Sequence, residues 1–167
     1  MSNLFSDLEG LRIAMEIEQI GAAFYQKASE HVNKPELKEA LQFLTGEENK
    51  HFATFTALYE KIKNNKEYAG DEYLFDPEAS RYLTVLAEGH IFPQQARVVT
   101  GIEELGSVEE ILAIAVQAEK DSIMFFTELA AEAKFEETSK IFLALQAEEK
   151  GHLVKLRVII DSLAKNK

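Results

Sequence analysis

The sequence contains no cysteine, and only three of its 167 residues are proline. Without cysteine the chain can form no disulfide, no thiolate metal site, no iron–sulfur cluster and no Cys₄ iron site. No apolar run approaches the length of a membrane span, and the N-terminal residues lack the basic start and apolar core of a cleaved leader. We therefore expect a cytoplasmic protein with no membrane partner.

Positive charge is also scarce. Lys and Arg number 18 against 29 Asp and Glu, which gives a formal net charge of −11 at pH 7. Such a charge repels nucleic acid and anionic membranes and attracts cations. The contents of 46% hydrophobic and 28% charged residues are those of a globular protein that can bury a sizeable core. We expect one domain over residues 1–167 and no nucleic-acid partner.

An internal repeat organises the chain. Residues 6–63 align without a gap with residues 107–164, each residue matching the one 101 positions later, as 48 matches 149. Residues 64–106 join the two repeats and are long enough to run the length of a helical bundle. The repeat predicts two helical hairpins related by a pseudo-twofold axis and joined by a long crossover.

Each repeat contains two long helical patterns, rich in Ala, Leu, Glu and Lys and poor in Gly and Pro. Ser6 with Glu9, like Ser107 with Glu110, has the spacing of a capping box at a helix start. In the crossover, Asp76-Pro77 is typical of the start of a shorter helix. The predicted helices span residues 7–32, 35–64, 77–88, 108–133 and 137–165. The fold class expected is therefore all-α.

Apolar residues recur every three or four positions along each long helix, as on a core-facing stripe. A charged or polar residue interrupts each stripe near its middle. The stripes are Leu4, Leu8, Leu11, Met15, Glu18, Ala22 and Tyr25; Leu41, Leu44, Glu48, His51, Phe55, Leu58 and Ile62; Leu112, Val116, Glu119, Ile123 and Phe126; and Phe142, Leu145, Glu149, His152, Leu156, Ile159 and Leu163. Burying an isolated carboxylate is costly, so four converging carboxylates predict bound cations.

The interruptions are all of metal-ligand type, and they match between the repeats. They are Glu18, Glu48, His51, Glu119, Glu149 and His152. A lone glutamate or histidine is usually solvated, but six in core positions at one offset favour a symmetric two-metal site. Glu47 and Glu148 are paired in the same way and lie beside the stripe, so they are alternative ligands. The competing interpretation is a duplicated bundle whose acids face water.

The pattern resembles the di-iron carboxylate site of the ferritin-like superfamily, in which two helices each supply a Glu and two others each supply Glu-x-x-His. Residues 14–25 (Ala-Met-Glu-Ile-Glu-Gln-Ile-Gly-Ala-Ala-Phe-Tyr) and 117–126 (Gln-Ala-Glu-Lys-Asp-Ser-Ile-Met-Phe-Phe) look most like the rubrerythrin-like branch. The resemblance implies a ferritin-like four-helix bundle that holds two iron ions, with manganese or zinc as substitutes.

The same resemblance implies a role for each of the six residues. Glu18 and Glu119 would be terminal ligands, and Glu48 and Glu149 bridging ligands. His51 and His152 would complete one iron each. A ligating imidazole needs an acceptor for its other ring N–H, and Asp121 is a candidate for it. His90, in the crossover, is a further candidate ligand or proton donor and is alternatively a surface residue.

Two features depart from the rubrerythrin pattern. Rubrerythrins carry a C-terminal rubredoxin domain that delivers electrons. This sequence stops after the fourth long helix, so we expect an external electron donor such as a rubredoxin-like protein. Rubrerythrins also place a further carboxylate one helical turn after the third-helix Glu, where this sequence has Ser122. The near-symmetric set that results also resembles bacterioferritin.

The leading functional hypothesis is a di-iron oxidoreductase that reduces hydrogen peroxide or dioxygen, with one electron from each ferrous ion. Tyr25, on the stripe beyond Glu18, is the candidate catalytic residue as a proton or hydrogen-bond donor, and alternatively a core aromatic. Its repeat mate is Phe126. The alternatives are an iron-binding, ferroxidase or storage protein, and a metal-site-bearing bundle with no redox role. A homodimer is the expected assembly.

Overall fold

The computed structural model describes residues 4–88 and 106–166. Five α-helices account for most of these residues, and none of these residues forms a strand longer than an isolated bridge between Ser6 and Leu74. The helices are α1 (Asp7–His31), α2 (Pro35–Lys63), α3 (Pro77–Glu88), α5 (Val108–Glu132) and α6 (Glu136–Lys165). Short 3₁₀ turns at Lys66–Tyr68 and Asp71–Tyr73 lead from α2 to α3.

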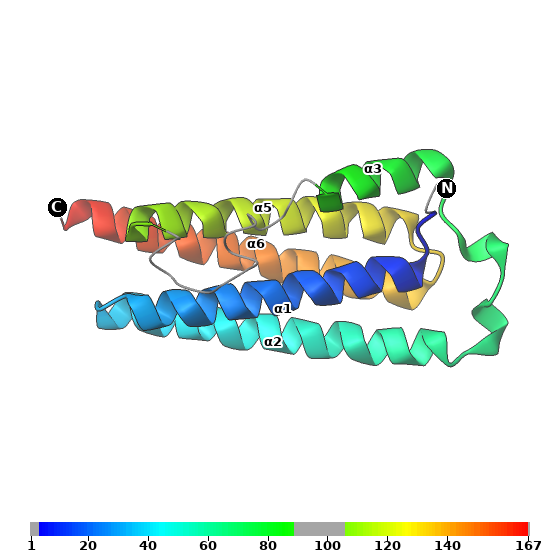
Figure 1. Ribbon diagram of the computed structural model, residues 1–167, viewed down its shortest axis with the longest axis horizontal. Helices are drawn as coiled ribbons and strands as arrows, with labels where there is room; N and C mark the ends of the chain where they lie inside the picture. The colour runs from blue at the N-terminus through cyan, green and yellow to red at the C-terminus, as the bar shows by residue number, and fades with distance from the viewer. Residues whose placement is uncertain (1–3, 89–105, 167) are drawn as a thin grey trace.

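The four long helices form a bundle of two hairpins (Figure 1). α1 packs mainly on α2, and α5 packs mainly on α6, while α1 with α5 and α2 with α6 make the contacts between the hairpins. α3 lies along α5 at the end of the bundle where the chain begins. The predicted all-α ferritin-like four-helix bundle is therefore confirmed.

The starts of α1 and α5 show why these repeats begin where they do. At α5 the capping box is complete, because the Ser107 hydroxyl accepts from Glu110 N and the Glu110 carboxylate accepts from Ser107 N at 2.8 Å. Gly106 precedes the capping box with a φ of 90°, a backbone conformation that residues other than glycine rarely adopt. At α1 the Ser6 hydroxyl accepts from Glu9 N, but the Glu9 carboxylate binds Arg12 instead. The predicted box is thus only half formed there.

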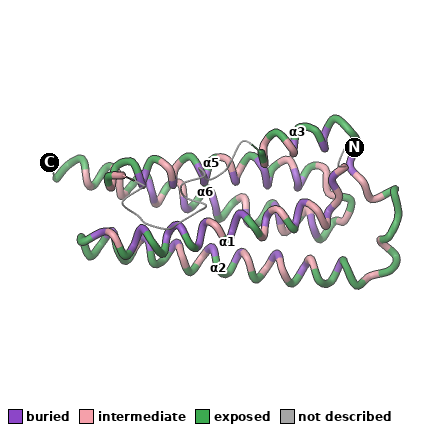
Figure 2. The backbone as a smooth tube through the Cα atoms, viewed as in Figure 1, coloured by how far each residue is buried: buried purple, intermediate pink, exposed green. Residues whose placement is uncertain are grey.

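The predicted stripes describe α2 better than they describe α1. All seven stripe positions of α2 are buried. On α1, however, Leu4, Leu8 and Met15 are only partly buried, while Ala14, Ile17 and Phe24, outside the predicted stripe, belong to the core. On α5 the partly buried stripe residues are Val116 and Ile123. Figure 2 shows the buried positions following the inward sides of the long helices.

The crossover packs on the bundle through part of its predicted aromatic set. The rings of Tyr68 and Tyr73 lie 3.9 and 4.9 Å from that of Phe135, and Phe75 is 2% exposed. Tyr82, one of the crossover aromatics expected to pack on the bundle or on a second subunit, is 43% exposed. The crossover residues Phe92 and His90 lie outside the described residues.

Phe5 and Asp7 link the start of the chain to the crossover and to the second hairpin. Phe5 O accepts from Phe75 N, and the Ser80 hydroxyl accepts from Phe5 N. The buried Asp7 carboxylate accepts from the backbone N–H groups of Lys134 and Phe135, at the turn between α5 and α6. Among the residues described, we find no helix that combines the length and the apolar character needed to cross a membrane.

Candidate metal centre

The structure brings all six predicted site residues together in the middle of the bundle. Each long helix contributes, and every one of these side chains is at most 5% exposed. Glu18 comes from α1, Glu48 and His51 from α2, Glu119 from α5, and Glu149 and His152 from α6. Their oxygen and nitrogen atoms form two groups, each within 4.8 Å across. One contains Glu18, Glu48, His51 and Glu149; the other contains Glu48, Glu119, Glu149 and His152.

The two groups share Glu48 and Glu149. Glu149 directs Oε1 to His51 Nδ1 at 2.9 Å and Oε2 to His152 Nδ1 at 2.8 Å. One carboxylate thus reaches both imidazoles, which is the geometry that a bridging ligand needs. Glu48 Oε1 lies 3.4 Å from His152 Nδ1. Glu18 and Glu119 each occur in one group only, as terminal ligands would.

A small residue makes room for Glu48. A Cβ on Gly21, one turn after Glu18 on α1, would lie 2.7 Å from Glu48 Oε2. The repeat mate of Gly21 is Ser122, which is buried on α5. The position where rubrerythrins place an additional carboxylate is therefore occupied by a small hydroxyl on one side and by no side chain on the other.

The donor set fits metal ions better than it fits a self-contained polar core. Buried polar atoms nearly always have hydrogen-bond partners. In this site Glu18 Oε1 and Oε2, Glu48 Oε1, Glu149 Oε1 and His51 Nδ1 have none within the described part of the chain. His51 Nδ1 also lies 3.3 Å from Glu18 Oε2. Unsatisfied carboxylate oxygens and imidazole nitrogens that face one another are the ligands suited to iron or manganese.

Without metal, the site is electrostatically strained. Burial, with repulsion from neighbouring carboxylates, raises the pKa of Glu18, Glu48 and Glu119 well above the usual range. Burial acts in the same direction on Glu149, but the close contacts with His152 and His51 outweigh it and lower its pKa. Burial opposes the charge of both histidines, yet the surrounding carboxylates raise the pKa of His51 to about 9 and that of His152 to about 12.

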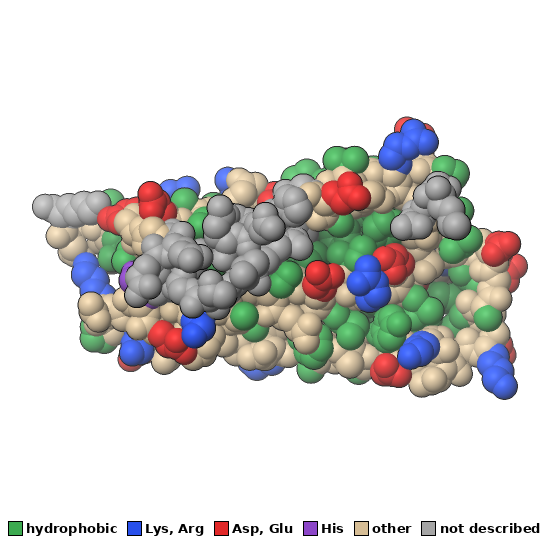
Figure 3. All heavy atoms as spheres, in the orientation of Figure 1, with side chains coloured by type: hydrophobic (Ala, Val, Ile, Leu, Met, Phe, Trp, Pro, Cys, Tyr) green, Lys and Arg blue, Asp and Glu red, His purple; other side chains and the backbone are tan. Residues whose placement is uncertain are grey.

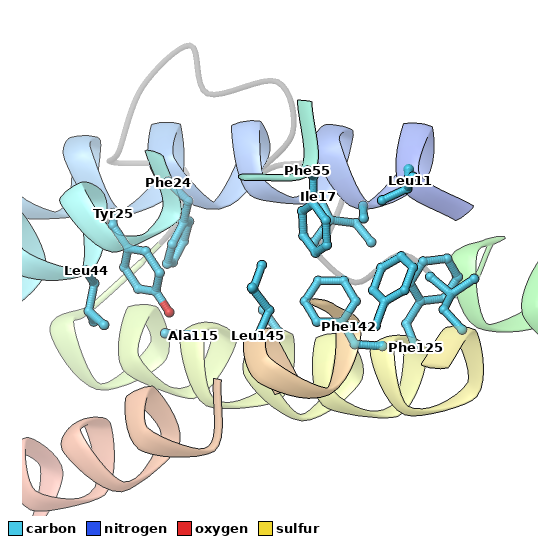
Figure 4. Close-up of a cluster of buried hydrophobic side chains, with 14 of the residues drawn as sticks. Leu11, Ile17, Phe24, Tyr25, Leu44, Phe55, Ala115, Phe125, Phe142 and Leu145 are labelled. Carbon is cyan, nitrogen blue, oxygen red and sulfur yellow. The ribbon is translucent and has the colours of Figure 1, made fainter. Parts of the chain in front are cut away.

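Tyr25 adds a hydrogen-bond donor on one side of the site. Its hydroxyl donates to Glu119 Oε1 at 2.5 Å, and the whole side chain is buried. Figure 4 shows Tyr25 reaching from α1 toward the opposite hairpin. Burial and the nearby Glu119 carboxylate raise the pKa of Tyr25 well above its usual value, so the hydroxyl keeps its proton. Its mate Phe126 carries no such group.

Aromatic rings form an apolar wall next to the site. Phe126 lies 5.3 Å from Phe55 and 5.8 Å from Phe142, and all three rings are fully buried. Phe24 and Phe125 are buried as well, as Figure 4 shows for this cluster. Phe52, next to His51 on α2, is only half-buried.

The outer edges of the two imidazoles have different partners. His51 Nε2 lies 2.8 Å from Glu148 Oε2, and because a carboxylate only accepts, the ring nitrogen donates. Asp121, predicted for such a role, instead accepts from Gln117. Glu148 and Glu47 were alternative ligands in the sequence. The structure places Glu148 behind the ring and outside every such group, whereas Glu47 forms a third group with His51 and His152, its oxygen within 4.8 Å of a nitrogen of each ring. Sequence spacing put Glu148 near a histidine but could not show on which side of the ring.

Comparisons with known proteins agree with this geometry. The family model described as Rubrerythrin matches residues 110–167. A hypothetical protein from Pyrococcus furiosus aligns over 98% of this chain and 93% of its own, with 26% identity and a TM-score of 0.69. A Thermotoga maritima crystal structure titled as a ferritin-like diiron-carboxylate protein aligns over 93% and 95%, with 25% identity and a TM-score of 0.67. No curated protein matches the chain significantly.

The family match lies in the second repeat, and the structural matches extend over both hairpins. The bundle, its matched Glu-x-x-His pairs and these similarities support a rubrerythrin-like protein of the ferritin-like superfamily.

Proposed function

We propose that the chain is a di-iron oxidoreductase that reduces hydrogen peroxide or dioxygen with electrons from an external donor. The observation that carries the proposal is the buried set of four glutamates and two histidines with unsatisfied donor atoms facing one another. The Rubrerythrin match and the ferritin-like diiron-carboxylate neighbour support iron as the metal. Manganese would suit the same ligands, and zinc would occupy them without redox activity.

Bound iron would supply two electrons, one from each ferrous ion, so that hydrogen peroxide with two electrons and two protons becomes two waters. Glu18 with His51, and Glu119 with His152, would hold one ion each, and Glu48 and Glu149 would hold both. Four carboxylates neutralise two divalent cations, so the buried charge that destabilises the metal-free site becomes balanced.

The remaining residues control water and protons. The buried rings of Phe55, Phe126 and Phe142 limit access of bulk water to one side of the site. The protonated hydroxyl oxygen of Tyr25 lies 2.5 Å from Glu119 Oε1, so its proton is within reach of a ligand oxygen of the second group. We propose Tyr25 as the proton donor, acting on one side only.

Counting bound Fe²⁺ in an anaerobic titration of metal-free protein, followed by peroxide and dioxygen kinetics, tests the proposal. We expect two tight equivalents per chain and turnover when a reductant such as a reduced rubredoxin is supplied. Replacing Glu149 with Ala should abolish two-iron binding and turnover, because Glu149 reaches both histidines. Replacing Glu136 with Ala removes an exposed carboxylate of the same helix and should change neither. An unchanged peroxidase rate in Glu149→Ala would refute the assignment.

One observation favours a second candidate, a ferroxidase. Ser122 leaves the ligand set without the additional carboxylate of rubrerythrins, which makes it nearly symmetric. For a ferroxidase, Fe²⁺ itself is the substrate. Oxidation of many Fe²⁺ per chain by dioxygen, with no need for another reductant, would favour this function over the first. A homodimer remains our prediction for the assembly, and sedimentation velocity would test it against a storage shell of many subunits.

A further inference from the structure

The two repeats differ behind the histidines, outside the ligand set. Glu148 accepts from His51 Nε2 at 2.8 Å. Its repeat mate, Glu47, lies within 4.8 Å of ring nitrogens of His51 and His152. Within the described residues, however, the hydrogen bond that Glu47 makes is with Lys50, whose Nζ lies 2.6 Å from Glu47 Oε1. In the described part of the chain, the hydrogen bond and the close carboxylate contacts of His152 are made by Nδ1, and Nε2 makes no hydrogen bond.

A single difference in the repeat accounts for this. Lys50 is three residues after Glu47, so on a helix it lies over the same face. The residue at the matched position after Glu148 is Gly151. Glu148 therefore has no lysine one turn further along its own helix, and its carboxylate accepts from His51 Nε2 instead. Lys50 is 74% exposed, and a Cβ on Gly151 would meet nothing within 4 Å, so both positions accept other side chains.

The hydrogen bond behind a ligating imidazole affects the metal. An acceptor on the outer nitrogen fixes the proton there, leaves Nδ1 free to bind, and makes the ring a stronger ligand. Loss of such a partner typically weakens metal binding about 10- to 100-fold. His51 has this partner, with Nδ1 turned to Glu18 and Glu149, and His152 lacks it.

We propose that Glu148 positions His51 as the stronger metal ligand. We also propose that Lys50 makes the two metal positions unequal, because its ion pair with Glu47 keeps that carboxylate from accepting a hydrogen bond from His152 Nε2. The inference rests on the proposed metal centre and adds an order of filling to it. The ion on the His51 side binds first, and the ion on the His152 side binds second. An exposed ion pair such as Lys50–Glu47 is weak. Releasing Glu47 therefore changes the metal affinity of the His152 position, relative to that of the His51 position, by no more than about five-fold.

Histidine ring NMR during a Zn²⁺ titration of metal-free protein tests this directly, because zinc is diamagnetic and each ring reports its own occupancy. At one equivalent we expect the His51 resonances to shift and those of His152 to remain largely unchanged. Replacing Lys50 with Ala should tighten the second position about three- to five-fold, so that the two rings fill more nearly together. Replacing Glu148 with Ala should weaken the first position about ten-fold.

Gly151→Lys is the matched converse, since it gives Glu148 the lysine that Glu47 has. It should weaken binding at His51 about three- to five-fold, while Gly151→Ala, which adds the side chain without the charge, should leave the order of filling unchanged. Rings that fill together in the unmodified chain, or an order unaffected by Lys50→Ala and Gly151→Lys, would overturn the inference and leave the two-metal site standing. No Zn²⁺ or Fe²⁺ bound by the unmodified chain would overturn both proposals.

Discussion

The first and second repeats carry identical ligand-type residues in different surroundings. Glu18, Glu48 and His51 match Glu119, Glu149 and His152 without exception. The neighbouring positions carry different residues in the two repeats. Tyr25 in the first repeat corresponds to Phe126 in the second, Gly21 to Ser122, and Lys50 to Gly151. The comparison teaches that the two metal positions have equivalent ligand residues. They differ in the neighbouring residues that bind, protonate or make room for those ligands.

The largest expected difference between the repeats is in the proton affinity of the metal-free histidines. The pKa is about 9 for His51 and about 12 for His152, because His152 Nδ1 faces three buried carboxylates and His51 Nδ1 faces two. During a pH titration followed by ring NMR, His51 should lose its proton well before His152. Coincident midpoints would remove this distinction.

The same values set the pH dependence of stability. Both histidine pKa values lie above the unfolded value of about 6.5. The stability that each charged ring contributes is therefore complete below about pH 6.5 and is lost as the pH rises through the folded pKa. The raised pKa values of Glu18, Glu48 and Glu119 act with the same sign, since these groups resist ionisation in the fold. Urea denaturation of metal-free protein should show the free energy of unfolding falling from pH 6.5 to 9, and a flat profile would contradict the assignment.

Tyr25 and Phe126 offer a smaller but sharper contrast. Tyr25→Phe removes the hydroxyl that donates to Glu119. We expect both metals to remain bound and turnover to fall about 10²-fold, as for loss of a proton donor. Adding Phe126→Tyr to this variant should not restore turnover, because Phe126 packs against Phe55 and Phe142 in an apolar cluster. Stability that falls while turnover is kept would reduce Tyr25 to a core aromatic.

The smallest expected difference is at the helix starts. Glu110 completes the capping box of α5, whereas Glu9 makes an exposed ion pair with Arg12. Glu110→Ala should lower the free energy of unfolding by about 1 kcal/mol. Glu9→Ala should lower it by about 0.5 kcal/mol or less. Urea denaturation of the two variants side by side measures the difference, and equal losses would show that the half-formed box at Ser6 is as stabilising as the full one.

Much of the fold could be predicted because its determinants are local or periodic. The caps at Ser6, Asp76 and Ser107 mark helix starts, and the repeat fixes the hairpin pairing. The stripe was accurate on α2, which buries one narrow face. It was less accurate on α1 and α5. α5 also packs on α3, so it buries a wider arc than a single stripe describes.

The site was predictable in its residues and less so in their surroundings. Glu and His at stripe positions of four helices must converge if the stripes face one core. The partner of a ring nitrogen depends on the rotation of the imidazole and on neighbours from another helix, neither of which a one-dimensional pattern contains. Asp121 was therefore a wrong choice as the acceptor for a ring N–H, and only the structure shows that Glu148 accepts from His51. The single-domain boundary over residues 1–167 stays a prediction.

Asp7 has a consequence for how this bundle opens. The N-cap of α6, Phe135, has no side-chain cap of its own and relies on the Asp7 carboxylate from the other hairpin. Separating the hairpins at that end would leave two backbone N–H groups unsatisfied and an acid without its partners. At the opposite end, Val32, Leu37, Val108 and Leu163 line a surface groove. The face drawn in Figure 3 shows hydrophobic side chains interspersed with charged ones toward the end of the bundle where the chain begins. Amide hydrogen exchange should therefore be slower at Lys134 and Phe135 than in the turn between α1 and α2.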